Sequence, residues 1–277
     1  MSISFTNPRS GEEFPFGEAV EFEGTVEGPA VQVDLIADRE FPLPTVTLRD
    51  GQWFVANRFQ RSGERTIAAR AFDGEGNEVA NAETTIRVAS PNFGALVPIP
   101  RNINRGVTRA LHATMIQALG RPGELTPECS TVTSPRVRRL LTTTDVGPFR
   151  VTGLLPAVEA IRRIFDRVRE REPDLFGQLG TAGMLCCRRI RTTPGRPPSR
   201  NFSNHSWGTA IDIKIRGALD PRGDGMTQLG LLMLHPFFNE ERFFWGAGFS
   251  GSLEDSMHFE ASNELVRDWR EQGLLEA

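Results

Sequence analysis

Residues 203–212 read SNHSWGTAID, and residues 255–260 read DSMHFE. These two short segments hold two of the four histidines of the 277-residue chain, together with two aspartates. Two imidazoles and one carboxylate are a ligand set typical of a catalytic zinc ion, whose fourth position stays open for water. The sequence therefore predicts one bound Zn2+, with His205, Asp212 and His258 as its ligands.

The first segment has the alternation of a strand. Isoleucines fall on one side of residues 209–215 and Asp212 falls on the other, so the carboxylate projects away from the apolar face. His205 precedes this strand on a turn that ends at Gly208. We expect the small residues Gly208 and Ala210 to leave room around Asp212 for a metal and a substrate.

The second segment supplies the remaining acidic groups. His258 begins another predicted strand, and Asp255 falls on the turn that enters it, where a carboxylate can take a proton from water and pass it to a leaving amine. Glu254 is the adjacent alternative for this role. Glu260 shares a strand face with His258 and is placed to orient a histidine. Ser203, in the first segment, is predicted to hydrogen-bond the substrate or to hold its loop.

The pattern Ser-x-His-x-x-Gly-x-Ala-x-Asp, followed by Trp-Gly and then Asp-x-x-His-Phe-Glu, resembles the zinc D-Ala-D-Ala carboxypeptidase / L-Ala-D-Glu endopeptidase family of cell-wall enzymes. The resemblance covers roughly residues 95–270. It implies an α+β zinc peptidase domain of the Hedgehog/DD-peptidase-like kind, with zinc ligands at His205, Asp212 and His258 and the catalytic base at Asp255. An aspartate at the base position is more like the L-Ala-D-Glu endopeptidase branch.

The resemblance also implies an arginine upstream of the first histidine, which would stabilise the oxyanion that forms from the scissile carbonyl. The candidate run is CCRRIR at residues 186–191. Arg188 is predicted by its position, with Arg189 as the alternative. The family's usual Gly-Tyr-Arg context is missing from this run.

Aromatic residues and the other histidines complete the candidate site. Trp207 and Trp245 are predicted to contact the substrate, with core packing as the alternative for Trp207. Phe249 stands where many relatives carry tryptophan, so the wall facing the substrate differs from theirs. His112 and His235 are expected to be structural, because neither has a ligand-like partner nearby in the sequence.

The rest of the chain divides into a β-rich part and a mixed part. Residues 1–90 contain short alternating stretches separated by Gly-, Asp- and Asn-containing turns, which predicts a small antiparallel sandwich. Their order resembles bacterial immunoglobulin-like modules. Residues 91–100, rich in proline, are predicted to be a linker, and residues 101–277 to be the α+β domain.

Three helices are predicted in the second part, over residues 107–119, 154–171 and 226–238. The second carries the clearest amphipathic stripe. Because these helices and the motif-bearing strands show no regular βαβ alternation, the sequence favours an α+β fold.

Composition excludes several classes of function. The net charge of −3 gives no electrostatic case for nucleic-acid binding. No apolar run approaches the ~20 residues that span a bilayer, and the first residues lack a secretory signal. Three cysteines are too few for a disulfide framework, so we expect free thiols, with pairing of Cys129 to Cys186 or Cys187 as the alternative.

Taken with the resemblance, these features predict a peptidoglycan hydrolase that cleaves an amide bond of the stem peptide at the cell wall. The alternative is a zinc-stabilised binding or adhesion module without catalysis. Without a Sec signal, the protein would reach the wall by another route, such as a phage tail or an injection apparatus. The N-terminal sandwich would then contact a surface or a component of that apparatus.

Overall fold

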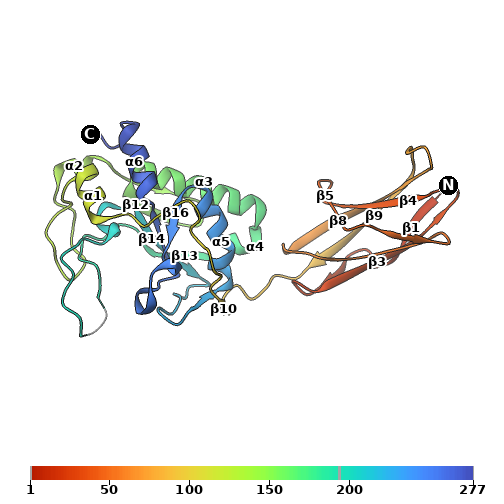
Figure 1. The fold of residues 1–277 in the computed structure, drawn as a ribbon, viewed down its shortest axis with the longest axis horizontal. Helices are drawn as coiled ribbons and strands as arrows, with labels where there is room; N and C mark the ends of the chain where they lie inside the picture. The colour runs from red at the N-terminus through yellow and green to blue at the C-terminus, as the bar shows by residue number, and fades with distance from the viewer. Residues whose placement is uncertain (1, 193–194, 277) are drawn as a thin grey trace. The chain divides into compact units, whose positions relative to one another are not determined.

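The chain forms two compact units, residues 1–91 and 92–277, each with its own hydrophobic core. The structure is a computed structural model and describes residues 2–192 and 195–276. Figure 1 shows an N-terminal unit made of strands and a C-terminal unit in which strands and helices are mixed. Among the described residues, no helix is both long and apolar enough to cross a membrane.

The N-terminal unit is a sandwich of two sheets, with strand orders β1-β3-β7-β6 and β2-β9-β8-β4-β5. Every second residue of β3 is buried, because alternate side chains of a strand point to opposite faces. The predicted sandwich is confirmed, with one parallel pair, β2–β9, in an otherwise antiparallel arrangement. The strands are β1 (Ser2–Asn7), β2 (Glu12–Phe14), β3 (Ala19–Glu27), β4 (Gln32–Ala37), β5 (Phe41–Pro42), β6 (Thr47–Arg49), β7 (Gln52–Arg58), β8 (Gly63–Phe72) and β9 (Glu78–Val88).

The C-terminal unit is built on a four-stranded antiparallel sheet of order β13-β14-β17-β16. Two further pairs, β10–β15 and β11–β12, are also antiparallel. The strands are β10 (Leu96–Pro98), β11 (Leu141–Asp145), β12 (Arg150–Leu154), β13 (Leu179–Gly183), β14 (Ala210–Ile215), β15 (Met226–Gln228), β16 (Phe243–Trp245) and β17 (His258–Ala261). The helices are α1 (His112–Leu119), α2 (Pro135–Arg139), α3 (Leu155–Arg171), α4 (Pro173–Phe176), α5 (Leu229–Glu240) and α6 (Asn263–Glu271).

Helix α3 buries the apolar stripe that the sequence predicts. The stripe consists of Val158, Ile161, Ile164, Phe165 and Val168, all fully buried. Each such side chain contributes about 1.5–3 kcal/mol when it is removed from water. The stripe therefore anchors α3 within the core, where the helix contacts β11, β12 and α5.

Two predicted helices begin later than expected. Residues 107–111 are not helical, because the backbone N–H and hydroxyl of Thr108 donate to the Glu264 carboxylate at 2.8 and 2.6 Å. α1 consequently starts at His112. Met226–Gln228 form β15 and pair with β10, so α5 starts at Leu229.

The segment predicted as a linker, residues 91–100, belongs largely to the C-terminal unit. β10 lies within it, and Phe93 is buried in the core of that unit. The backbone carbonyl of Phe93 also accepts a hydrogen bond from Gly230 at the start of α5. Proline-rich composition indicated a connection, whereas strand pairing and one buried aromatic ring make the segment part of the fold.

The loop between β14 and β15 is anchored by a buried carboxyl group. One oxygen of Asp220 accepts a hydrogen bond from the backbone N–H of Gln228 at 2.6 Å. The other oxygen is buried and has no hydrogen-bond partner among the described residues. Burial raises the pKa of Asp220 to about 6, and the charges of Glu254, Asp224 and Asp255 add to the rise.

We expect Asp220→Asn to stabilise the protein at pH 8 and to have little effect near pH 4. The pKa of Asp220 is higher in the folded state than in the unfolded state, so the native carboxyl keeps its proton at low pH. The free energy of unfolding of the protein therefore falls as the pH rises through about 6. Asparagine keeps the acceptor for Gln228 without the buried charge. Melting temperatures of both proteins at pH 4.5, 6 and 8 test this, and a gain that does not change with pH would contradict it.

Candidate metal centre

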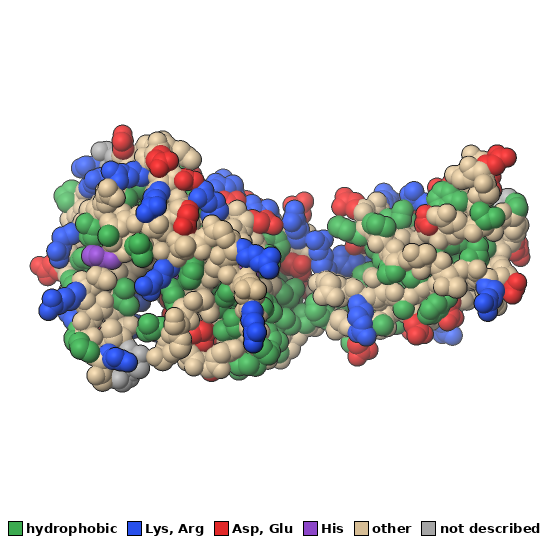
Figure 2. Space-filling view, viewed as in Figure 1, with side chains coloured by type: hydrophobic (Ala, Val, Ile, Leu, Met, Phe, Trp, Pro, Cys, Tyr) green, Lys and Arg blue, Asp and Glu red, His purple; other side chains and the backbone are tan. Residues whose placement is uncertain are grey.

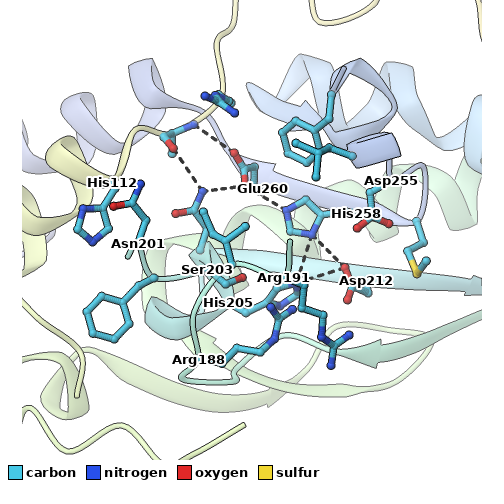
Figure 3. A pocket seen from close by; sticks show the side chains of 18 of the residues that line it. His112, Arg188, Arg191, Asn201, Ser203, His205, Asp212, Asp255, His258 and Glu260 are labelled. Carbon is cyan, nitrogen blue, oxygen red and sulfur yellow. Dashed lines mark hydrogen bonds and ion pairs between the residues drawn. The ribbon is translucent and has the colours of Figure 1, made fainter. Parts of the chain in front are cut away.

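Three side chains from separate elements converge in the C-terminal unit (Figure 3). His205 comes from a 3-10 turn (Asn204–Trp207), Asp212 from β14 and His258 from β17. Asp212 Oδ1 lies 3.2 Å from His205 Nε2 and 3.0 Å from His258 Nδ1, and the two ring nitrogens are 3.2 Å apart. The three residues predicted as metal ligands therefore lie together.

The strand register brings Asp212 and His258 together. The two residues are direct partners in the antiparallel β14–β17 pair, so their side chains rise from the same face of the sheet. The isoleucines of β14 occupy the opposite face and are fully buried in the core. Packing of that apolar face fixes the side from which the ligands project, as the sequence predicts.

The turn that carries His205 depends on a close backbone contact. Gly208 ends the turn with a φ of 65°, and a Cβ at this position would lie 2.6 Å from the Cα of Gly153. Gly208 is small because β12 packs against it, and Ala210 is fully buried. Neither residue lines the cavity, so the prediction that they leave room there for a metal and a substrate is wrong. Their small size allows close backbone packing instead. His205 Nδ1 donates to the carbonyl of Met184 at 3.0 Å, which leaves Nε2 for a metal.

The His258 ring is held from its other nitrogen. Nε2 donates to Glu260 at 3.0 Å, which leaves Nδ1 facing the other two ligands. Glu260 also accepts from the Asn204 side chain at 2.7 Å and from the Ala110 backbone at 3.2 Å. The structure thus places Glu260 where the sequence predicts an orienting carboxylate. Its partners Asn204 and Ala110 gave no signal in the sequence.

The charges at this site favour a cation. Burial lowers the pKa of His258, but hydrogen bonds to Asp212 and Glu260 outweigh it and raise this pKa to about 10. Burial raises the pKa of Asp212, but the two histidine rings hold it well below its usual range. In the metal-free protein a proton on His258 balances the ionised Asp212. Two imidazole nitrogens and one carboxylate oxygen that converge in this way fit a zinc ion in place of that proton.

The three side chains line a cavity of about 260 Å3. Asp255 and Ser203 line it as well, together with four arginines: Arg109, Arg188, Arg191 and Arg222. Ser203 is buried, and its backbone bonds to Arg188 and Ser206, so it holds the loop in addition to facing the cavity. A metal at this place would have an acid and several cations within the same cavity.

Asp255 reaches the cavity and Glu254 does not. The two carboxylate oxygens of Glu254 accept from Ser256 Oγ at 2.7 Å and from the Gly223 backbone at 2.8 Å. Burial raises the pKa of Asp255, which suits a group that exchanges protons. Gly246 permits this arrangement, because a Cβ there would lie 2.5 Å from the Asp255 carbonyl oxygen. Of the two acids that the sequence offered as the base, the structure places Asp255 at the cavity.

The candidate oxyanion arginines separate in the same way. Arg188 lines the cavity, whereas Arg189 points its guanidinium to the Leu125 carbonyl. Burial and the neighbouring Arg191 lower the pKa of Arg188, while Asp212 raises it. Figure 3 shows Arg188 and Arg191 among the side chains of this cavity, together with the metal ligands.

The two tryptophans predicted to contact substrate are core residues instead. Trp207 and Trp245 have no exposed surface and do not line the cavity. Their indole N–H groups donate to the carbonyls of Gly120 and Ser256 at 2.8 and 2.6 Å. Both rings help to position the motif backbone from behind, which spacing alone did not distinguish from a substrate wall.

The remaining candidates are His112, His235 and Phe249. His235 is stacked on Trp245, and burial lowers its pKa to about 4, which fits the expected structural role. His112 lines the cavity and stacks on Phe202, and its structural role stays a prediction. Phe249 also lines the cavity.

The sequence reasoning missed two cavity arginines, Arg109 and Arg222, because they have no fixed spacing from the histidines. Arg191 lies in the candidate run 186–191 but was not chosen from it. Arg222 lies in the β14–β15 loop, between Pro221 and Gly223. Its guanidinium Nε is 3.1 Å from Asp255 Oδ2.

Two of the cysteines form a disulfide, Cys129–Cys186, with their Cα atoms 5.2 Å apart. The expectation of three free thiols is wrong for these two and correct for Cys187, which is buried and free. The backbone N–H of Cys186 donates to the carbonyl of His205 at 3.0 Å. The disulfide therefore links Cys129 to a residue that is hydrogen-bonded to the His205 turn and lies two positions before Arg188.

Comparison with protein families gives one match. The family model described as D-alanyl-D-alanine carboxypeptidase matches residues 197–261. This short segment contains the three candidate ligands, Asp255 and Glu260. No curated protein is similar enough to the chain to count as a match.

Several solved structures are similar at low sequence identity. The fibronectin(III)-like modules of Clostridium thermocellum CbhA are 17% identical with a TM-score of 0.28, covering 31% of this chain and 93% of the other. The CARDB domain of PF1109 from Pyrococcus furiosus is 15% identical with a TM-score of 0.25, covering 32% and 91%. The endo-beta-1,4-mannanase of Thermotoga petrophila is 15% identical with a TM-score of 0.29, and the chain spans only 20% of its length. The N-terminal unit is identified as a sandwich from its two sheets, not from these similarities.

We expect reduction of the disulfide to destabilise the protein and to weaken metal binding. Loop closure across a sequence separation of 57 residues contributes about 4 kcal/mol to the free energy of unfolding in the chain-entropy estimate. Urea unfolding and zinc titration with and without a dithiol reductant measure both effects. Cys186→Ser is the control, because it should match the reduced protein and should not respond to the reductant. Equal stability of the oxidised and reduced wild-type protein would contradict the prediction.

Proposed function

We propose that the C-terminal unit is a zinc-dependent peptidase that hydrolyses an amide bond in the stem peptide of peptidoglycan, of the D-Ala-D-Ala or L-Ala-D-Glu type. The observation that carries the proposal is the convergence of His205, Asp212 and His258 in one cavity with Asp255. The family match over residues 197–261 supports the same reaction class. We expect this hydrolysis to take place at the cell wall, where the substrate lies.

The residues of the cavity divide the chemistry between them. When bound, zinc polarises the scissile carbonyl and acidifies water. Asp255 takes the proton of the attacking water and then gives it to the leaving amine, so the proton ends on the product. Arg188 offers its guanidinium to the oxygen that becomes negative as the carbonyl is attacked. Glu260 keeps the His258 ring in the tautomer that leaves Nδ1 free.

The charge around the cavity supports an anionic substrate. Four arginines line it, against three acidic residues, Asp212, Asp255 and Glu260. Residues 92–277 carry 24 lysines and arginines against 20 acidic residues, whereas residues 1–91 carry 8 against 15. Figure 2 shows lysine and arginine side chains distributed over the visible face of the C-terminal unit. A stem peptide with free carboxylates fits such a surface.

We expect Asp255→Asn to bind zinc as the wild type does and to lose about 10²–10⁴-fold in kcat, the usual contribution of a general acid–base group. His205→Ala should lose both zinc and turnover. Purified peptidoglycan and zinc-loaded protein are incubated together, the released fragments are identified by mass spectrometry, and zinc content is measured by elemental analysis. The fragment masses identify the bond.

The matched control is Asp166→Asn on α3, which exchanges an exposed aspartate that does not line the cavity. Its turnover should equal that of the wild type. Full turnover of Asp255→Asn would reject the base assignment. No fragments from the zinc-loaded wild type would reject the peptidase itself.

A further inference from the structure

The side chain of Asp255 is held by one partner from a different loop. Arg222 Nε lies 3.1 Å from Asp255 Oδ2, and both residues line the cavity. The Asp255 side chain is 16% exposed and that of Arg222 38% exposed, so the ion pair reaches from the cavity wall toward solvent. The contact joins the β14–β15 loop to the segment that precedes β17.

Only one oxygen of the Asp255 carboxylate is used in this contact. Oδ1 is buried and has no hydrogen-bond partner among the described residues. Glu241 on the same unit differs, because both of its oxygens are paired. One of its oxygens accepts from Arg163 and the other from Arg167, both at 2.8 Å. The ion pair with Arg222 is therefore the one side-chain contact that fixes the Asp255 carboxylate among the described residues.

The backbone around Arg222 is fixed relative to Asp255. The N–H of Gly223 donates to Glu254 at 2.8 Å, and Glu254 accepts in turn from Ser256. Gly223 has a φ of 74°, and a Cβ there would lie 3.0 Å from the Cα of Ser252. The residues on either side of Asp255 therefore hold the loop that presents the Arg222 guanidinium.

We propose that Arg222 is a positioning residue for Asp255: it binds Oδ2 and thereby fixes the carboxylate at the cavity wall, where the carboxylate receives the proton of the attacking water. This inference rests on the proposed function. The proton then passes from the Asp255 carboxylate to the leaving amine, and Arg222 keeps its charge and its own protons throughout. The loop that carries Arg222 lies outside both sequence motifs.

The test compares Arg222→Gln and Arg222→Lys with Arg216→Gln. Arg216 lies at the start of the same loop, contacts Asn92 and does not line the cavity, so it is a matched control. Arg222→Gln should lower kcat on a synthetic stem peptide at least ten-fold with little change in KM, while zinc content stays at the wild-type value. Lysine restores a cation near Oδ2 and should recover part of the loss. Arg216→Gln should behave as the wild type.

A second measurement does not depend on activity. In the metal-free protein, Arg222→Gln and Asp255→Asn should change the urea midpoint less in combination than the sum of their separate effects, because both remove the same ion pair. Additive midpoints, an unchanged kcat, or a loss confined to KM would each overturn the proposal. If the wild type releases no fragments, the peptidase function fails and this catalytic role fails with it. If the wild type is active and Arg222→Gln is equally active, only the positioning role fails.

Discussion

The antiparallel pairing of β14 with β17 sets Asp212 opposite His258, and the candidate site depends on this register. A shift of one residue would turn the ligands into the core and the isoleucines toward the cavity. Burial of Ile211, Ile213 and Ile215 makes that shift costly, so hydrophobic packing on one face determines the chemistry on the other. The His205 turn and the Asp255 segment join an arrangement that the sheet has already fixed.

The acidic groups of this region differ in how fully they are satisfied. Glu260 and Glu254 each have hydrogen bonds to both oxygens, and both act as supports for neighbouring residues. Asp212 is balanced by two imidazoles, which hold its pKa low. Asp255 alone among these four keeps a buried oxygen without a partner. An unsatisfied buried acceptor costs free energy, and Asp220 in the β14–β15 loop carries a buried oxygen of the same kind.

Much of this site could be predicted from the sequence, because the ligands follow short-range rules. Strand alternation placed Asp212, a glycine-terminated turn placed His205, and spacing placed Asp255 and Glu260. The arginines of the cavity could not be predicted, because Arg222 approaches Asp255 only through loop packing. The substrate contact predicted for Trp245 was wrong, whereas Trp207 is a core residue, the alternative that the sequence had left open. The spacing of an indole from the motifs is the same whether it faces the core or the cavity. The linker predicted over residues 91–100 was wrong because composition does not show strand pairing, and β10 in this segment pairs with β15.

The most direct test of the metal centre is X-ray diffraction from zinc-soaked crystals, with data collected on both sides of the zinc absorption edge. The account predicts one anomalous peak bound by His205 Nε2, His258 Nδ1 and an Asp212 oxygen, with Glu260 still hydrogen-bonded to His258 Nε2. Zinc bound elsewhere, or no peak at these three side chains under saturating zinc, would contradict it.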